Sequence, residues 1–473
     1  MSEALPTAAI ILAAGKSTRM CSKLPKPLQP VCGLPLTSHV VRACQKAGIE
    51  RIVVVVGYEA ERVKQGLTEA VEGPLEFAHQ ALQRGTGDAV SAAKSLLGDW
   101  KGDIVVLVGD IPLLPASALR AVLEKHRTSG AAATLLTAIT DDPTGYGRVI
   151  RNADKTVSHL VEERDASPEE RAVKEWNPSI YAFQSSQLWA ALEQVEPNNA
   201  QGEFYFTDTV GVLTRQGKQV EAVAVADARF VLGANNKIEL AQLNALMREQ
   251  ILRELMISGV TIVDPLNTYI ESDVEVGQDT IIEPNVTLKR GTKIGADCLI
   301  GLGSRIEASV IGDNVQILSS QIVGSTLEER VKVGPFANLR PGTHLGVGVK
   351  VGDFVEIKNS TLEAGAQAAH LTYIGDATVG AGSNIGGGTI TCNYDGFLKH
   401  KTTIGKGVFV GSHSTLIAPV TVHDGAFIAA ASSITDEVPE DALAIARARQ
   451  ENKEGWAKRF REKQEAKKLT KDA

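Results

Sequence analysis

The sequence predicts a mixed α/β protein: a doubly wound, Rossmann-like N-terminal domain joined by a helix to a C-terminal left-handed parallel β-helix. Three observations support this prediction. Short aliphatic runs alternate with amphipathic stretches in the first half, one long helical pattern follows, and the second half repeats an aliphatic residue every six positions. At 473 residues the chain is also too long for one hydrophobic core, which indicates two or more domains.

The first half has the pattern of a parallel sheet covered by helices. Aliphatic runs occupy residues 8–13, 52–56 and 104–108, and amphipathic stretches occupy residues 38–47 and 86–97. Strands that alternate with helices favour a doubly wound domain. Ligands bind such sheets at the carboxyl ends of the strands, so the residues after each run are the candidates for a site.

A glycine turn with cationic neighbours follows the first run. Gly15, Lys16 and Ser17 suggest a P-loop, but that motif needs a glycine where the chain has Ile10, and no Gly-x-Gly-x-x-Gly motif is present. Backbone N–H groups, Lys16 and Arg19 are available to an anion such as a phosphate. A plain tight turn fits the same residues equally well.

The string Leu-Ala-Ala-Gly-Lys-Ser-Thr-Arg-Met at residues 12–20, followed by Pro25 and Lys26, resembles the opening signature of the sugar-1-phosphate nucleotidylyltransferases. Ser17 stands where that family usually has a second glycine. If this position needs a left-handed backbone, serine costs about 1 kcal/mol. The resemblance implies that Lys26 and Arg19 are catalytic and neutralise phosphate charge. It also implies nucleotide contacts from the first strand and its turn: Leu12, Ala13, Ala14 and Gly15.

Later segments resemble the same family. The resemblance implies a uracil-reading loop made by Gln83, Gly85 and Thr86. It also implies a sugar-binding side made by Gly147, Glu162 and Asn177. Pro178 and Ser179 follow Asn177 where the family has Thr-Gly or Ser-Gly, which is a departure from the pattern.

A Mg²⁺ site is implied by the same resemblance. Asp110 ends an aliphatic run and matches the family's metal-binding aspartate, and Asn235 matches the second ligand. One or two carboxylates suffice because Mg²⁺ keeps waters and phosphate oxygens as its other ligands. On the residues alone, Asp110 also suits a turn or helix cap, and Asn235 suits a helix N-cap.

A helical pattern follows and predicts the boundary between the halves. Leu243, Met247, Ile251 and Leu255 share one face, and Gly259 lies beyond the predicted end. We therefore predict a nucleotidylyltransferase domain at residues 1–234, a linker helix at 235–259, and an acetyltransferase β-helix with its tail at 260–473, the last assignment being justified below.

The second half repeats an aliphatic residue every six positions, which fits neither a helix nor an alternating strand. Such hexapeptide repeats are typical of a parallel β-helix, with three hexads in each coil. Residues 307–332 and 359–403 break the period, and breaks of this kind often carry function. Residues on the period include Val276, Ile282, Leu288, Ile294, Ile300, Ile306, Val333, Leu339, Leu345, Val351, Ile357, Ile404, Val410, Leu416, Val422, Ile428 and Ile434.

The second break carries the chemistry. It contains Ala-Ala-His-Leu-Thr-Tyr-Ile-Gly-Asp at residues 368–376, then Asn-Ile-Gly-Gly-Gly-Thr and Cys-Asn-Tyr-Asp-Gly. Together with the first half, these motifs resemble the bifunctional uridylyltransferase/acetyltransferase family. That family makes UDP-N-acetylglucosamine, a precursor of peptidoglycan and lipopolysaccharide. A zinc carbonic anhydrase would need three clustered histidines, and the spacing of the histidines does not argue for a cluster.

The resemblance assigns the second site. His370 is implied as the base that takes a proton from the attacking amine, which suits an imidazole near neutrality, with Glu356 assisting. Glucosamine-1-phosphate is implied to contact Arg340, Lys358, Tyr373, Asn384 and Lys401. Acetyl-CoA is implied to contact Gly387, Asn393, Tyr394, Ser412, Ala430 and Arg447, with Gly387 standing where alanine is usual.

Composition sets the remaining expectations. The net charge of −7 argues against nucleic acid as the main partner, and the basic tail after Arg447 suits an anionic ligand or a solvated end. Five unpaired-looking cysteines and no secretory signal or membrane span predict a cytoplasmic protein. We expect small-molecule partners (UTP, N-acetylglucosamine-1-phosphate, glucosamine-1-phosphate and acetyl-CoA), Mg²⁺ and a homotrimer. A single nucleotidylyltransferase with an architectural β-helix, and an acetyltransferase with a decayed first domain, are the alternatives.

Overall fold

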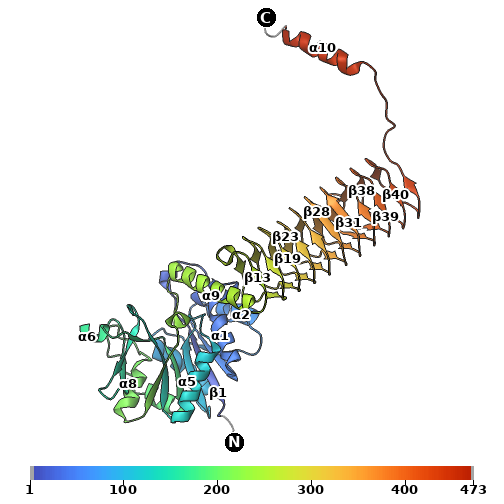
Figure 1. Cartoon of the computed structure of the whole chain (residues 1–473). Helices are drawn as coiled ribbons and strands as arrows, with labels where there is room; N and C mark the ends of the chain where they lie inside the picture. Colours follow the sequence, from blue (N-terminus) through green and yellow to red (C-terminus); the bar gives the residue numbers. More distant parts are fainter. Residues whose placement is uncertain (1–4, 470–473) are drawn as a thin grey trace. The chain divides into compact units, whose positions relative to one another are not determined.

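The computed structural model describes residues 5–469, so the outermost residues of the predicted end domains, 1–4 and 470–473, lie outside the described residues. The chain divides into two compact units. The first runs to Ile257 and includes Tyr269–Asp273, and the second comprises Ser258–Thr268 and the chain from Val274 onward. The predicted fold class, a Rossmann-like unit and a parallel β-helix, is confirmed (Figure 1).

The first unit is built on a mixed sheet in the order β5-β4-β1-β6-β11-β7-β10-β8-β9, with β12 beside β7. The three predicted aliphatic runs form its parallel centre. Their β-branched side chains fit a pleated surface that is covered on both faces. Its strands are β1 (Thr7–Ala13), β4 (Arg51–Val56), β5 (Glu76–His79), β6 (Asp103–Val108), β7 (Ala133–Ile139), β8 (Gly147–Arg151), β9 (Val157–Val161), β10 (Glu175–Asn177), β11 (Ile180–Gln184) and β12 (Val220–Ala224), with the small hairpin β2 (Pro30–Val31) and β3 (Leu34–Pro35).

Helices cover both faces of this sheet and bury separate cores. Ala9 and Ile11 of β1 face one core, while Ala8 and Ile10, alternating with them, face the other. The helices are α1 (Leu36–Lys46), α2 (Ala60–Ala70), α3 (Thr86–Ala92), α4 (Lys94–Leu97), α5 (Ala116–Ser129), α6 (Pro168–Arg171), α7 (Ser185–Leu192), α8 (Asp208–Arg215) and α9 (Lys237–Ile257), with short 3₁₀ turns η1 (Thr18–Met20), η2 (Lys26–Leu28) and η3 (Ala228–Val231).

Helix α9 belongs to the first unit and packs against its other elements. Leu240, Leu243 and Met247 are buried in a cluster that includes Met20 and Leu36 of that unit. The short strand β14 (Tyr269–Ile270) belongs to the same unit, and the Arg248 guanidinium lies 4.6 Å from the Tyr269 ring centroid. The division into domains at residues 234 and 260 stays a prediction, but any fragment that contains the first unit should extend to residue 273.

The second unit is a β-helix of short strands in three parallel sheets, with the η4 turn (Pro265–Asn267) near its start (Figure 1). The first sheet stacks β13 (Thr261–Ile262), β16 (Ile281–Ile282), β19 (Leu299–Ile300), β22 (Gln316–Ile317), β25 (Lys332–Val333), β28 (Lys350–Asp353), β31 (Gln367–His370), β34 (Asn384–Ile385), β37 (Phe409–Val410), β40 (Phe427–Ile428) and β42 (Leu443–Ala444).

The other two sheets complete each coil, and helix α10 (Trp456–Leu469) follows the last coil. The second sheet stacks β17 (Thr287–Leu288), β20 (Arg305–Glu307), β23 (Gln321–Val323), β26 (Asn338–Leu339), β29 (Glu356–Lys358), β32 (Tyr373–Gly375), β35 (Ile390–Cys392), β38 (Thr415–Ile417) and β41 (Ser433–Ile434). The third stacks β15 (Glu275–Val276), β18 (Lys293–Ile294), β21 (Val310–Ile311), β24 (Thr326–Leu327), β27 (His344–Leu345), β30 (Thr361–Leu362), β33 (Ala377–Val379), β36 (Thr402–Ile404) and β39 (Val420–Val422).

The repeating aliphatic residues point into the shared core, as predicted. Ile282, Ile300 and Ile317 are fully buried and stack in register. The prediction that residues 307–332 interrupt the β-helix is wrong. Strands β20 to β25 continue the coils there, and the six-residue period is lost only because some corners are one residue shorter. Within 359–403 the coils also continue, with corners one residue shorter, and the inserted segment is the loop at residues 393–401.

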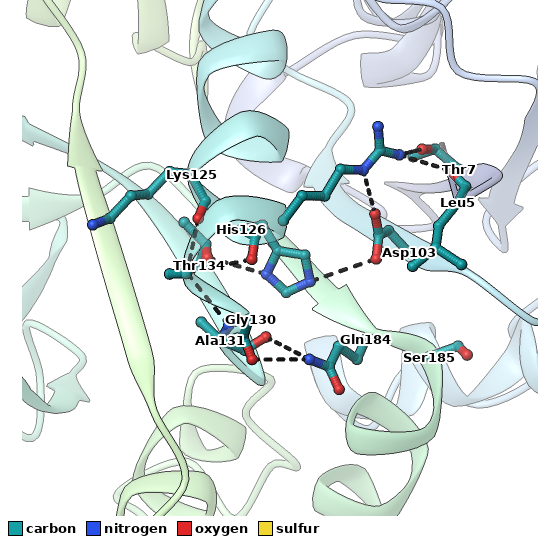
Figure 2. A network of polar contacts seen from close by, with 12 residues as sticks. Leu5, Thr7, Asp103, Lys125, His126, Gly130, Ala131, Thr134, Gln184 and Ser185 are labelled. Atoms are coloured by element: carbon teal, nitrogen blue, oxygen red, sulfur yellow. Dashed lines mark hydrogen bonds and ion pairs between the residues drawn. The ribbon is translucent and has the colours of Figure 1, made fainter. Parts of the chain in front are cut away.

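A buried histidine lies at the edge of the first sheet where the parallel strands begin (Figure 2). His126 is 1% exposed, with Nδ1 3.1 Å from Thr134 Oγ1 and Nε2 3.7 Å from an Asp103 carboxylate oxygen. Arg127 donates to the other Asp103 oxygen at 2.8 Å. The same guanidinium ties down the start of β1 through the Leu5 carbonyl and the Thr7 hydroxyl.

This network predicts that the free energy of unfolding of the first unit falls as the pH drops below about 6.5. Burial lowers the pKa of His126 and outweighs the attraction of Asp103, while Arg127 adds repulsion. The unfolded chain therefore binds its proton first, and the stability that is fully present above about pH 6.5 is lost on acidification. Urea unfolding between about pH 5 and 8, followed by fluorescence of Trp100 and Trp176, measures this dependence.

The variant His126→Gln should flatten that pH dependence, because it removes the titrating ring. His159→Gln provides the matched control, since it removes a half-exposed histidine of the same unit. An unchanged slope in His126→Gln would show that other groups cause the acid sensitivity.

Candidate active sites

A cavity of about 380 Å³ opens at the carboxyl ends of β1 and β6. Parallel strands that end at one edge bring their following loops together, so this is the position at which a ligand is expected. The cavity gathers nine of the predicted residues: Leu12, Ala13, Ala14, Gly15, Lys26, Gln83, Gly85, Thr86 and Asp110. Ser17, from the turn predicted to hold the nucleotide, lines it as well, and so do Thr37, Gln80 and Glu203, which were not predicted.

Four of the predicted polar residues form one cluster beside this cavity. The Lys26 ammonium contacts the Asp110 carboxylate directly and donates to Asn235 Oδ1 at 3.3 Å. Arg19 donates to the same Asn235 oxygen at 3.1 Å. A carboxylate oxygen and an amide oxygen therefore face one cation, which is a donor set that suits Mg²⁺. Within residues 5–469 no group of three or more His, Cys, Asp and Glu side chains could hold a metal, so any metal here relies on this smaller set.

The predicted base-reading loop is held in place by backbone and side-chain contacts. Gln83 donates to the Ala14 carbonyl at 2.8 Å, and the Thr86 hydroxyl accepts from the Phe206 N–H at 2.9 Å. Gly85 has φ +116°, and a Cβ there would lie 2.5 Å from the Phe204 carbonyl oxygen. Only glycine fits this close approach, which fixes the loop against the neighbouring segment.

The predicted sugar-side residues lie outside the cavity lining. Gly147 and Glu162 are adjacent, since a Cβ on Gly147 would lie 3.4 Å from a Glu162 carboxylate oxygen. Burial raises the pKa of Glu162, which also accepts from the Thr207 hydroxyl at 3.2 Å. Asn177 is buried, and its amide donates to the Tyr181 hydroxyl at 2.6 Å.

Two serines at positions where glycine is usual have left-handed backbones. Ser17 has φ 47° and Ser179 has φ 60°, so the conditional expectation for Ser17 is met. Each side chain costs about 1 kcal/mol relative to an unstrained conformation. Ser179 is held by an Asx turn in which its N–H donates to Asn177 Oδ1 at 3.1 Å.

On the β-helix, His370 ends strand β31 and is exposed at a corner of the coil. Its Nδ1 lies 2.8 Å from an Asp353 carboxylate oxygen, because Asp353 ends β28 and pairs in register with His370. Glu356, which the sequence analysis placed beside His370, instead accepts from Arg340 at 2.8 Å. Asp353 was missed because its alignment with His370 depends on coil register.

Cations and amides gather at the next corner of the coil, where strands β29 and β32 of the second sheet end. Lys358 lies 3.7 Å from Asp376, and the Asn393 amide contacts Asp376 and, at 3.5 Å, the Tyr373 hydroxyl. Repulsion from the neighbouring Lys358 ammonium lowers the pKa of Lys399. Lys399 was not predicted, although it lies only two residues from the predicted Lys401, and both line a hollow of about 370 Å³.

Three of the residues predicted for acetyl-CoA, Gly387, Ser412 and Ala430, follow His370 along the same corner, coil by coil, whereas Asn393 and Tyr394 follow β35 of the second sheet. His413 N–H donates to the Gly387 carbonyl at 2.8 Å, and Ala431 N–H donates to the Ser412 carbonyl at 2.8 Å, so Gly387, Ser412 and Ala430 are stacked. A Cβ on Gly387 would lie 3.2 Å from His370 Cβ, so glycine leaves room beside the imidazole. Asn384 lies on β34 of the same sheet, Tyr394 is exposed, and Arg447 lies in the exposed segment after β42.

The cavity at the carboxyl ends of the parallel strands, with its lysine–aspartate pair, is the site expected of a nucleotidyl transferase domain. The profile of the nucleotidyl transferase family matches residues 8–230. Curated relatives extend the similarity to the whole chain. The bifunctional protein GlmU of Shouchella clausii is 46% identical over 451 residues, covering 95% of this chain and 98% of that protein. That of Geobacillus thermodenitrificans is 46% identical, covering 97% and 99%. The chain belongs to the bifunctional GlmU family.

A solved structure of UDP-glucose pyrophosphorylase complexed with UDP-glucose matches 52% of this chain and 100% of that chain. Its TM-score is 0.42 at 14% identity, which is too low to support a conclusion about this protein.

Membership in this family confirms the predicted enzyme class, a bifunctional transferase that makes UDP-N-acetylglucosamine by acetyl transfer and uridylyl transfer. Its substrates are small molecules, and the nucleotidyl transferase chemistry uses a divalent metal. Within residues 5–469 no helix is both long and apolar enough to span a membrane.

Proposed function

We propose that the two activities occupy two separate sites: uridylyl transfer in the cavity at the ends of β1 and β6, and acetyl transfer at the His370 corner of the β-helix. The observation that carries this proposal is the placement of two preformed polar clusters, one around Lys26 and Asp110 and one around His370 and Asp353, in different compact units. Acetylation comes first and supplies N-acetylglucosamine-1-phosphate to the uridylyl site.

In uridylyl transfer, a phosphate oxygen of N-acetylglucosamine-1-phosphate attacks the α-phosphorus of UTP and pyrophosphate leaves. Asp110 and Asn235 would hold Mg²⁺, which supplies charge neutralisation on the phosphates. Lys26 and Arg19 add positive charge at the same place, so no covalent protein intermediate is needed. The base lies against Gln83, Gly85 and Thr86, next to the turn formed by Leu12, Ala13, Ala14 and Gly15. The sugar extends toward Gly147, Glu162 and Asn177.

In acetyl transfer, the neutral amine of glucosamine-1-phosphate attacks the thioester carbon, and coenzyme A leaves as the thiolate. Asp353 accepts from Nδ1–H of His370, which leaves Nε2 free to take the amine proton. The protonated imidazole can then return that proton to the departing thiolate. Arg340, Lys358, Lys399 and Lys401 provide positive charge for the sugar phosphate, and Tyr373 and Asn384 position the sugar. Acetyl-CoA follows the corner past Gly387, Asn393, Tyr394, Ser412, Ala430 and Arg447.

The working acetyltransferase is proposed to be a homotrimer. Phe336, Phe354 and Leu371 lie at successive coil corners, are more than half exposed and have left-handed backbones. The rings of Phe336 and Phe354 stack at 5.4 Å. Such an apolar edge beside His370 suits burial against another copy of the chain, and a cyclic arrangement closes without an open surface. Phe397, 91% exposed in the loop at residues 393–401, is a second apolar group available to a neighbour.

Independence of the sites gives the first test of the proposed function. Asp110→Ala should abolish pyrophosphate release and leave acetylation intact, whereas His370→Ala should lower acetylation by about 10²–10⁴-fold and leave pyrophosphate release intact. Both products are assayed separately in purified full-length protein. His344→Ala, which changes a half-exposed histidine of the β-helix, serves as the control. Parallel loss of both activities in folded Asp110→Ala protein would refute the two-site proposal.

Asp353 should act on His370 and not on substrate affinity. Asp353→Asn removes the anion that stabilises the protonated imidazole, so we expect kcat for acetylation to fall by about 10-fold or more with KM for acetyl-CoA little changed. ¹⁵N NMR of the imidazole should show a changed tautomer balance in the variant. Glu328→Gln, which alters the carboxylate beside His344, is the matched control. A rise in KM with unchanged kcat would assign Asp353 to substrate binding instead.

The apolar edge predicts the oligomeric state. Phe336→Glu/Phe354→Glu should convert the trimer to monomers by light scattering, abolish acetylation and spare uridylyl transfer, because charge is costly to bury at an interface. Val310→Glu places the same charge on an exposed residue of the third sheet and should leave the trimer intact. Trimers that survive in the double variant would remove this edge from the interface.

A further inference from the structure

The side-chain amide of Asn235 has one end that attracts a cation and one end that repels it. Its Oδ1 accepts from Arg19 at 3.1 Å and from Lys26 at 3.3 Å. Its Nδ2 donates to a carboxylate oxygen of Glu239 at 3.3 Å. The two ends of an amide have nearly the same shape, so their hydrogen-bond partners decide which end faces a ligand. Rotation of this amide by half a turn would present N–H donors where a metal needs an oxygen.

Glu239 holds Asn235 at two points. The carboxylate oxygen that accepts from the Asn235 side chain also accepts from the Asn235 backbone N–H, at 2.7 Å. Glu239 lies in the first turn of α9, where the partial positive charge of the helix terminus favours a carboxylate. The helix start is capped by another residue, because Asn236 Oδ1 accepts from the backbone N–H groups of Ile238 and Glu239 at 2.9 and 3.0 Å. The Glu239 carboxylate is therefore available to orient Asn235.

Glu239 also lies close to the other predicted metal ligand. The segment before Asn235 rests against Asp110, since a Cβ on Gly233 would lie 3.3 Å from the Asp110 carboxylate. Burial raises the pKa of Tyr146, and the negative charges of Glu239 and Asp110 raise it further. Because both carboxylates act on one hydroxyl, they belong to the same site.

We propose that Glu239 is a positioning residue for the uridylyl site: its carboxylate holds the Asn235 amide with Oδ1 on the side of Asp110, the orientation in which both residues offer an oxygen to a divalent metal. This inference rests on the proposed function of the cavity, in which Asp110 and Asn235 hold Mg²⁺. Glu239 itself is not a metal ligand, since its oxygens accept from the N–H groups of Asn235 and Asn236.

Metal binding by the full-length protein tests this role. Glu239→Ala should raise the Kd for Mn²⁺, measured by electron paramagnetic resonance in the presence of UDP-N-acetylglucosamine, by about 10-fold or more. The Mg²⁺ concentration that gives half-maximal pyrophosphate release should rise by a similar factor, whereas KM for UTP at saturating Mg²⁺ should stay within about twofold. Glu239→Gln keeps an oxygen that accepts from Asn235 and should recover most of the lost affinity.

A second substitution separates orientation from a general structural effect. Asn235→Asp replaces the amide by a carboxylate whose two oxygens are equivalent, so rotation of the group no longer matters. In the Asn235→Asp background, Glu239→Ala should therefore not weaken Mn²⁺ binding, although it does so beside the natural asparagine.

Two further variants serve as controls on helix α9. Asn236→Ala removes the helix cap and should lower the unfolding temperature. Glu249→Ala removes an exposed carboxylate of the same helix. Neither variant should change the Kd for Mn²⁺, because neither touches the Asn235 amide.

Two kinds of result would overturn the inference in distinguishable ways. A folded Glu239→Ala protein that binds Mn²⁺ with the wild-type Kd, or that loses the same affinity in the Asn235→Asp background, would show that Glu239 does not orient the amide. Unchanged Mn²⁺ binding in both Asp110→Ala and Asn235→Ala would instead refute the proposed metal site itself.

Discussion

In-register pairing of parallel strands is the constraint on which both units depend. In the first unit it ends β1 and β6 at one edge, so that the turn after Ala14 and the segment at Asp110 meet although they lie far apart in sequence. In the β-helix it sets Asp353 directly beside His370 on the next coil. Neighbouring parallel strands lie about 4.8 Å apart, a distance that side chains on adjacent strands can bridge. Both candidate sites therefore arise from backbone pairing before any side chain is considered.

Paired opposite charges are the second shared feature. Lys26 contacts Asp110 in the first unit, and Arg340 with Glu356 and Lys358 with Asp376 do the same on the β-helix. The Arg340–Glu356 pair is exposed, and pairs of this kind contribute about 0–1 kcal/mol, so exchanging its carboxylate for a ligand phosphate costs little, whereas the Lys26–Asp110 and Lys358–Asp376 pairs are largely shielded from water. Each pair holds a cationic side chain in position before the ligand binds. The donors that a phosphate needs are therefore already oriented.

The sequence was informative wherever a pattern is local. The aliphatic runs located the central strands of the first unit, and the six-residue period located most coils of the solenoid. The period failed between Ile306 and Val333 because corners of the coil can lose a residue while the inward side chain keeps its place. Asp353 and Lys399 were missed because their importance depends on which residue of the neighbouring coil or loop they meet, and that register is set by corner lengths. The left-handed backbone of Ser17 could not be predicted outright, because a serine residue in a sequence does not by itself indicate a positive φ.

The solenoid has a further consequence for how this kind of chain can change over evolutionary time. Each coil contacts mainly the coils before and after it, and the early coils, such as the one formed by β16, β17 and β18, carry none of the candidate substrate residues. Gain or loss of a whole coil preserves strand pairing on both sides, whereas smaller changes are accommodated at the corners, as in the shortened corners of residues 307–332 and the loop at residues 393–401. Length in this half of the protein can therefore change in two ways that leave the core undisturbed, by whole coils along the stack or by residues gained and lost at the corners.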